Sequence, residues 1–255
     1  MTHPATLLKQ SWRAYARDFR AWLILTAPLA GLSALAMIFA IMFRGQPVLG
    51  DNAAAWMRIA LVAGIIIAFA ATVATARIFT TAVIVSAYRS LNGQKTNIKE
   101  SIRVGWRTFW PVLWVAILRG LIVLGGLILF IVPGIIWGLR YSLAVQAAAI
   151  EGKRGMSALH RSQDLTHGKL FEALINFATF SAVIGYGVWV AILAVTAVFI
   201  VFGALVMVAV PADSANIVSG VIVVITVIAE TITVWLATPL SPLAVTSVYK
   251  DFSDK

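Results

Sequence analysis

Residues 109–150 read FWPVLWVAILRGLIVLGGLILFIVPGIIWGLRYSLAVQAAAI, and Arg119 and Arg140 are the charged residues in this run. A single helix of that length would be about 60 Å long, roughly twice the hydrocarbon thickness of a bilayer. The turn-forming pair Pro133-Gly134 lies near its middle. The run therefore predicts two membrane spans joined by an outer turn at Pro133-Gly134.

Similar apolar runs flank this one on both sides. The chain has 255 residues, 61% of them apolar, and a mean hydropathy of +0.93, which is more than one soluble core needs. We expect an all-α integral membrane protein with six transmembrane helices and a single membrane domain, 1–255. The fifth apolar run, Leu170–Val210, is expected to form a single span that is bent or interfacial at its beginning, near Asn176. Besides the two halves of 109–150, the spans lie near Trp22–Phe43, Trp56–Ala87, Leu170–Val210 and Asn216–Leu240.

The basic residues between these spans predict the orientation. With six spans, two of them, Arg44 and Arg58, lie on one side, and fifteen lie on the side of both termini. An excess of Lys and Arg marks the cytoplasmic side, so both termini are expected there. The fifteen are Lys9, Arg13, Arg17, Arg20, Arg89, Lys95, Lys99, Arg103, Arg107, Lys153, Arg154, Arg161, Lys169, Lys250 and Lys255.

Two basic segments align without gaps and predict an internal repeat. Residues 9–19 match residues 99–109 in their Lys, Ser, both Arg and Phe, and residues 161–171 form a fainter third copy. The predicted units, about 1–90, 91–151 and 152–255, each hold a basic interfacial helix and a helical hairpin. Cations every four residues share one helix face with nearby aromatics, which favours binding at the headgroup layer. The alternative to a true repeat is that basic and aromatic residues are common wherever a chain enters a span from the cytoplasmic side. The predicted interfacial residues are Lys9, Arg13, Arg17, Lys99, Arg103, Arg107, Arg161 and Lys169.

Four charged residues fall inside predicted spans: Arg77, Arg119, Arg140 and Glu230. Each arginine lies eleven or twelve residues from the cytoplasmic end of its span, about 16–18 Å by helical rise. Because charges within lipid need a partner or a wet cavity, a shared depth favours one buried cluster. In one interpretation Glu230 pairs with one arginine and the others bond carbonyls or reach the surface. In the other, the excess of arginine forms an anion site with neutral donors from Tyr141, Gln146 and Thr231.

Several classes of function are not favoured. The chain has no cysteine, and its three histidines, His3, His160 and His167, have neither the spacing nor the companions of a metal site. Its net charge is +10, but the basic residues lie at span ends and are not gathered into a groove or stripe that could bind nucleic acid. We expect no cofactor, no metal and no enzymatic activity, because no catalytic constellation is recognisable.

The segment after the central turn resembles a known family. Ile131-Val-Pro-Gly, Arg140, Glu151-Gly, Ser157-Ala-Leu-His-Arg-Ser162 and Leu165-Thr-His-Gly168 are similar to a pattern of bacterial six-span membrane proteins. That group includes the YciC-type inner-membrane proteins and the membrane domain joined to some glycerophosphodiester phosphodiesterases. The resemblance implies a bacterial inner membrane and a six-helix bundle. It carries over Pro133, Gly134, Arg140, Glu151 and Ser162 as signature positions without an agreed function. By its position, Glu151 is expected to pair with Lys153 or Arg154.

These observations predict a non-enzymatic inner-membrane protein that engages anionic lipid, or a membrane-protein partner, through its basic helices and buried cluster. One alternative is a transporter or channel for an anion or a lipid-like substrate. Another is a subunit or assembly factor of a membrane complex, with an apolar face through Trp110, Trp114 and Trp137.

Overall fold

The computed structural model describes residues 3–42, 55–209, 211 and 214–254. These residues form helices and turns without a strand, as the long apolar runs predict. The elements are α1 Pro4–Arg17, α2 Phe19–Met42, α3 Ala55–Leu91, α4 Ile98–Arg107, α5 Phe109–Leu129, α6 Ile131–Arg140, α7 Ala144–Glu151, α8 Met156–Thr166, α9 Leu170–Phe180, the π-helical turn η1 Ser181–Gly185, α10 Tyr186–Ala209, α11 Ala215–Ala237 and α12 Leu240–Ser253.

Within the described residues, four helical segments are long and apolar enough to cross a membrane, and a fifth apolar helix, Phe19–Leu32, is shorter. The protein is therefore an all-α membrane protein. The end of the first predicted span at Phe43 and the outer-loop residues Arg44 and Asp213 lie outside the described residues. The four segments are Ile66–Leu91, Phe109–Leu129, Leu170–Val206 and Val218–Ser253.

The central turn lies three residues earlier than the sequence predicts. Helix α5 ends at Leu129, Phe130 adopts an extended conformation (φ −161°, ψ 149°), and α6 begins at Ile131. Pro133 lies in the first turn of α6, where backbone N–H groups have no intrahelical partner and a proline is tolerated. Gly134 is buried against α5. A Cβ atom at position 134 would lie 2.6 Å from the Leu127 side chain and 2.8 Å from its backbone nitrogen. The Pro-Gly pair thus lets the hairpin close without forming the turn itself.

The predicted fourth span is not a single helix. Helix α6 ends at Arg140, and α7 begins at Ala144 after a turn. The hydroxyl of Ser162 donates to the Arg140 carbonyl at 2.7 Å and accepts from the Leu143 amide at 3.1 Å. The Thr166 hydroxyl also lies 3.2 Å from the Arg140 carbonyl oxygen, while its shortest hydrogen bond, at 2.9 Å, is to the Ser162 carbonyl. Side chains of α8 therefore satisfy backbone groups that a continuous helix would pair internally.

The run that begins at Leu170 is continuous, as predicted. Helix α9 passes into α10 through the π-helical turn Ser181–Gly185, without a break at Gly185-Tyr186-Gly187. The irregularity predicted near Asn176 lies instead at this π-helical turn. A π-helical turn inserts an extra residue into a helix and is a common cause of bending.

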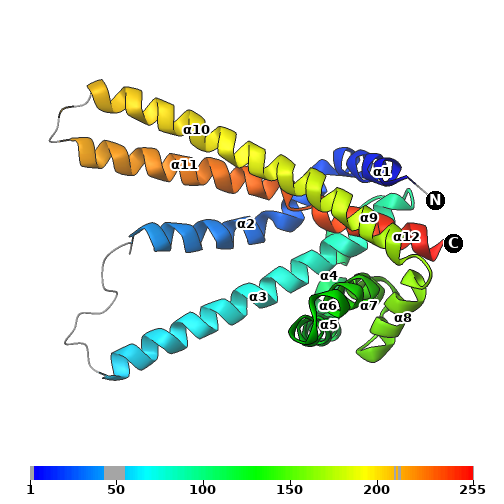
Figure 1. The fold of residues 1–255 in the computed structure, drawn as a ribbon. Coiled ribbons are helices and arrows are strands. Elements are labelled where there is room, and N and C mark those ends of the chain that lie inside the picture. Colours follow the sequence, from blue (N-terminus) through cyan, green and yellow to red (C-terminus); the bar gives the residue numbers. More distant parts are fainter. Residues whose placement is uncertain (1–2, 43–54, 210, 212–213, 255) are drawn as a thin grey trace. The chain divides into compact units, whose positions relative to one another are not determined.

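The chain forms two compact units. Unit 1 comprises residues 1–26, 77–186 and 237–255, and unit 2 comprises residues 27–76 and 187–236. Unit 1 contains the short helices and two clusters of buried apolar side chains, one around Leu143, Ala147 and Leu159, the other around Trp22 and Leu243. Figure 1 shows α1, α4, α7, α8, α9 and α12 gathered in this unit, with α5 and α6 viewed nearly end-on beside them.

In unit 1, the last helix of each predicted repeat unit packs on the first helix of another. Helix α3 crosses α4 so closely that a Cβ at Gly105 would lie 2.4 Å from the Ile78 carbonyl oxygen, and Ser86 donates to Ser101 at 2.6 Å. Helix α7 packs on α8, and α12 packs on α1. In the first two copies of the predicted repeat, the aligned residues Phe19 and Phe109 each begin a helix.

Unit 2 contains parts of four helices, α2, α3, α10 and α11. Helices α10 and α11 run side by side in Figure 1. A Cβ atom at Gly203 of α10 would lie 3.4 Å from the Ile222 side chain of α11. Large apolar side chains of this unit are mostly exposed, such as Val198 at 65% and Val208 at 89%. Exposed apolar surface on that scale needs an apolar solvent, which is the bilayer.

Candidate functional site

A cavity of about 520 Å³ lies among six helices of unit 1. It contains the best candidate for a ligand site because charged, polar and apolar groups all face it. Its lining comes from α3, α5, α6, α7, α9 and α12, with Arg77, Thr80, Ile84, Arg119, Ile135, Gly138, Leu139, Ser142, Val145, Gln146, Phe177, Ser241, Pro242 and Val245.

Two arginines face this cavity from different helices, Arg77 from α3 and Arg119 from α5. No carboxylate is among the residues that line it, and neither guanidinium forms an ion pair within the described part of the chain. The two like charges repel each other. An uncompensated cation pair in a low-dielectric site is costly, so the cavity favours an anion placed between the guanidiniums.

Gln146 adds a neutral polar group to the same cavity. Its side chain is 6% exposed, and its Oε1 atom is buried and accepts no hydrogen bond from any described residue. A buried polar atom without a partner is uncommon in folded proteins and requires an explanation. The neighbouring Ser142 hydroxyl cannot supply one, since it donates to the Leu139 carbonyl at 2.7 Å.

Arg140 and Tyr141 do not line the cavity, although their neighbours Leu139 and Ser142 do. Arg140 is the last residue of α6, where a cation interacts favourably with the helix dipole. Tyr141 packs against the larger apolar cluster. These two residues therefore contribute to the turn between α6 and α7 and not to the cavity wall.

Glu230 and Thr231 belong to unit 2. Glu230 accepts a hydrogen bond from Thr196 at 2.7 Å, which joins α11 to α10. Thr231 donates to the Val227 carbonyl of its own helix at 2.7 Å. Of the seven predicted anion-site residues, Arg77, Arg119 and Gln146 share one cavity, and Glu230 has a neutral partner within its own unit.

The predicted interfacial cations fall into two groups. Arg17 donates to Ser90, Arg161 pairs with Glu151, and Lys169 lies 5.2 Å from the ring centre of Phe252. The other group is exposed and stands beside exposed Trp12, Trp106 and Trp110. Its members are Lys9, Arg13, Lys99, Arg103 and Arg107.

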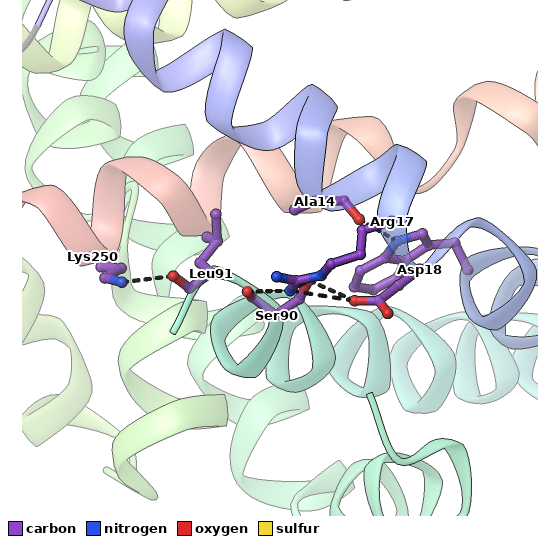
Figure 2. A network of polar contacts seen from close by, with 7 residues as sticks. Ala14, Arg17, Asp18, Ser90, Leu91 and Lys250 are labelled. Carbon is purple, nitrogen blue, oxygen red and sulfur yellow. Dashed lines mark hydrogen bonds and ion pairs between the residues drawn. The ribbon is translucent and has the colours of Figure 1, made fainter. Parts of the chain in front are cut away.

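Two cations, Arg17 and Lys250, hold the C-terminal end of α3, as Figure 2 shows. Arg17 donates to both the carbonyl and the hydroxyl of Ser90, and Ser90 in turn donates to Asp18 at 2.7 Å. Lys250 donates to the Leu91 carbonyl at 2.8 Å. The last carbonyls of a helix lack intrahelical partners, so these side chains cap α3 and tie it to α1 and α12.

Glu151 does not pair with Lys153 or Arg154 as predicted. It accepts hydrogen bonds from Arg161 at 2.9 Å and from Tyr249. Burial opposes its ionisation, but the hydrogen bonds from Tyr249 and Arg161 lower the pKa of its carboxyl. The sequence separation of 98 residues between Glu151 and Tyr249 explains why sequence reasoning missed this contact.

Other cavity residues were also missed. Thr80, Ser241 and Pro242 line the cavity, and none of them carries a charge. A usable signal was the Thr-Pro-Leu-Ser-Pro segment at 238–242, which interrupts an apolar run and so predicts a helix break. That break lies between α11 and α12.

Within the described ranges, no group of three or more His, Cys, Asp or Glu side chains could hold a metal ion. No protein-family model, curated protein or solved structure matches the chain.

Proposed function

We propose that this chain is a non-enzymatic protein of a bacterial inner membrane that binds the phosphate of an anionic lipid between Arg77 and Arg119. The observation that carries the proposal is that two guanidiniums from separate helices share a cavity whose described lining holds no carboxylate. Guanidinium groups match phosphate oxygens in geometry and charge.

The position of the cavity along its helices supports a lipid as the source of the phosphate. Gln146 lies five residues before Glu151, and Arg77 lies twelve residues before Arg89. Measured along the helices, the cavity thus extends from about 8 to about 18 Å below those charged ends. A lipid of that leaflet can bring its phosphate to the guanidiniums, because arginine side chains reach several ångströms toward the interface.

The apolar part of the cavity wall also supports an amphiphilic ligand. Ile84, Phe177 and Val245 line it together with the arginines. A free inorganic ion would leave these side chains against water or empty space, whereas the glycerol and upper acyl carbons of a lipid would cover them.

The exposed cations of α1 and α4, with Trp12 and Trp106, extend this contact to the membrane surface. In this proposal the N- and C-termini are cytoplasmic, the membrane domain has six spans built on the repeat, and α6 with α7 forms an interrupted fourth span. The packing of α3 on α4, of α7 on α8 and of α12 on α1 supports the repeat.

The test compares three arginine variants by native mass spectrometry and by titration of the detergent-purified protein with phosphatidylglycerol. Arg77→Gln and Arg119→Gln should each weaken lipid binding by about ten- to a hundredfold, since each removes a charge-assisted contact. Arg140→Gln is the matched control, because Arg140 does not line the cavity.

Equal lipid affinity in all three variants would overturn the proposal. Titration with inorganic phosphate separates the two sources of the anion. If the free ion binds as tightly as the lipid, the site serves an ion and not a headgroup. Flux of that ion into proteoliposomes would then favour the transporter alternative.

A further inference from the structure

We infer that the lipid held by Arg77 and Arg119 ends in a phosphomonoester, as phosphatidic acid does. Gln146 and Thr80 donate to the same phosphate. The inference rests on the proposed lipid site and names the class of headgroup that fits it. A phosphomonoester differs from a phosphodiester in two ways: its second ionisation adds negative charge near neutral pH, and it has three terminal oxygens where a diester has two.

The charge of the cavity is the first observation that points to a phosphomonoester. Arg77 and Arg119 give its described lining two positive charges, and no carboxylate offsets them. A phosphodiester carries a single negative charge and would leave one positive charge uncompensated beside Ile84, Phe177 and Val245. An uncompensated charge in apolar surroundings is costly. A phosphomonoester carries up to two negative charges and neutralises both guanidiniums.

Gln146 presents a donor to the cavity. Its side chain is more than nine-tenths buried, and its oxygen Oε1 is fully enclosed. The amide nitrogen Nε2 is therefore the polar atom that remains accessible in the cavity wall, and it forms no hydrogen bond among the described residues. An amide nitrogen has two N–H donors and no acceptor, so it suits an ionised phosphate oxygen.

Thr80 presents a second neutral donor and differs from the other threonines of α3. Thr72, Thr75 and Thr81 each donate to the carbonyl four residues earlier in the helix. Thr80 lines the cavity, and its hydroxyl forms no such bond within the described part of the chain. It lies one helical turn after Arg77, on the same face of α3. Its hydroxyl is thus available to a ligand held by that arginine.

Donors therefore surround the cavity from three helices, α3, α5 and α7. Ionised phosphate oxygens are acceptors, which matches this set of donors. A monoester offers three terminal oxygens to them. In a diester one of these oxygens becomes the ester link to the rest of the headgroup, where it carries no charge and accepts poorly. The cavity should prefer the monoester for its charge and for its additional acceptor.

The test compares lipids that share acyl chains and differ at the phosphate. Phosphatidic acid carries a phosphomonoester, whereas phosphatidylglycerol and phosphatidylmethanol carry phosphodiesters of different size. Equimolar pairs compete for the detergent-purified full chain, and native mass spectrometry gives the ratio of bound lipids. Each ratio is internal to one sample, so it does not depend on how much of the protein is folded.

We expect the wild-type chain at about pH 8 to prefer phosphatidic acid over either phosphodiester by about tenfold, the size of one charge-assisted hydrogen bond. Arg119→Gln leaves one positive charge in the cavity and should bring the ratio towards one. Gln146→Met and Thr80→Val keep the size of their side chains and remove a donor, so the combined variant should lower the ratio by about three- to tenfold. Thr75→Val is the matched control, because Thr75 does not line the cavity. It should keep the wild-type ratio.

The pH provides a second readout. The titratable groups that face the phosphate are Arg77 of α3 and Arg119 of α5, and both stay charged. Helices α6, α7, α9 and α12 contribute no titratable side chain to the described lining. A free phosphomonoester loses its second proton near pH 6, so the wild-type ratio should fall severalfold between about pH 8 and about pH 5.

Equal binding of the three lipids to the wild-type chain would overturn the inference and leave the proposed lipid site intact. A preference over phosphatidylglycerol but not over phosphatidylmethanol would assign the selection to headgroup size and contradict the inference. A ratio that is the same in the combined variant as in the wild type, or that is constant across pH, would also contradict it.

Inorganic phosphate has the same charge and oxygens and separates the two sources of this chemistry. It should displace phosphatidic acid only in large molar excess, because it cannot cover the apolar part of the cavity wall. Displacement at equal concentration would assign the site to the free ion and contradict the inference. Absence of any lipid binding to the wild-type chain would contradict the proposed function itself.

Discussion

Unit 1 and unit 2 place charged groups in apolar surroundings in opposite ways. In unit 1, Arg77 and Arg119 line one cavity without a carboxylate among its described lining residues. In unit 2, Glu230 has a direct neutral partner, Thr196. A charged group that has a hydrogen-bond partner inside the protein suits a structural role. Two like charges in one cavity without a counter-charge suit the binding of a ligand of opposite charge.

The two units also differ in what surrounds their helices. Buried apolar side chains are numerous in unit 1, whereas Val227 is the one found among the described residues of unit 2. Of the Lys and Arg residues that the structure describes, only Arg58 belongs to unit 2. Unit 1 is therefore held by its own core and polar contacts, and unit 2 relies on lipid to cover its helices. The predictions below test this difference, beginning with the largest effect.

The largest expected effect contrasts two glycines in helix pairs. Gly134→Ala places a methyl group within 2.8 Å of the Leu127 backbone nitrogen. We expect a loss of about 2–3 kcal/mol in unfolding free energy, because the hairpin must open to admit it. At Gly203 in unit 2 the nearest atom is 3.4 Å away, so Gly203→Ala should change stability by less than about 0.5 kcal/mol. Thermal unfolding followed by tryptophan fluorescence in one detergent measures both. Equal losses would show that the two units pack alike.

A smaller effect contrasts two hydroxyls. Ser162→Ala leaves the Leu143 amide and the Arg140 carbonyl without this buried partner, at a cost of about 1–2 kcal/mol. Thr196→Val removes the donor to Glu230 in unit 2. Side-chain hydrogen bonds within membranes average about 0.6 kcal/mol, so a smaller loss is expected there. The same unfolding assay ranks the two variants. A larger loss for Thr196→Val would mean that unit 2 depends on its polar contacts more than unit 1.

The smallest effect concerns the aqueous edge of unit 1 and depends on pH. The pKa of Glu151 is lowered below its ordinary value of 4.5, so its bonds stabilise the folded state above about pH 4.5. This contribution is lost as the pH falls below 4.5 through the folded-state pKa. Tyr249→Phe removes one of the donors and should cost about 0.5–1 kcal/mol at pH 7, a value reduced by partial exposure. The difference between wild type and variant should disappear at low pH. A difference that is constant across the acid range would contradict the role of Glu151.

The amino-acid sequence predicted part of the arrangement of residues around the cavity. Arg77 and Arg119 were predicted to lie together because charges at similar depth in apolar runs need a common solution, and Gln146 was predicted as a neutral donor beside them; one cavity is lined by all three, and their role in binding stays a prediction. Arg140 satisfies the same criterion but does not line the cavity, because α6 ends at that residue. Helical rise gives the depth of a residue, but it does not give its direction around the helix axis or a break in the helix.

Local composition also predicted the wrong position for the central turn. Pro133-Gly134 has the composition of a turn, yet the chain reverses at Phe130. Proline is as compatible with the first turn of a helix as with a loop, and a glycine can serve close packing instead of a turn. A Pro-Gly pair in a turn and a Pro-Gly pair at the start of a packed helix have the same sequence. They differ only in the neighbours that the fold supplies.

The sequence by itself determined that the chain is helical and lies in a membrane, because hydropathy depends on composition and on the length of apolar runs, both of which are local. The tertiary structure alone decided which polar residues meet. Arg77 and Arg119 are 42 residues apart in the sequence, and Glu151 and Tyr249 are 98 apart. Contacts at such separations depend on how helices cross, which is set by close approaches such as that of Gly105 to Ile78.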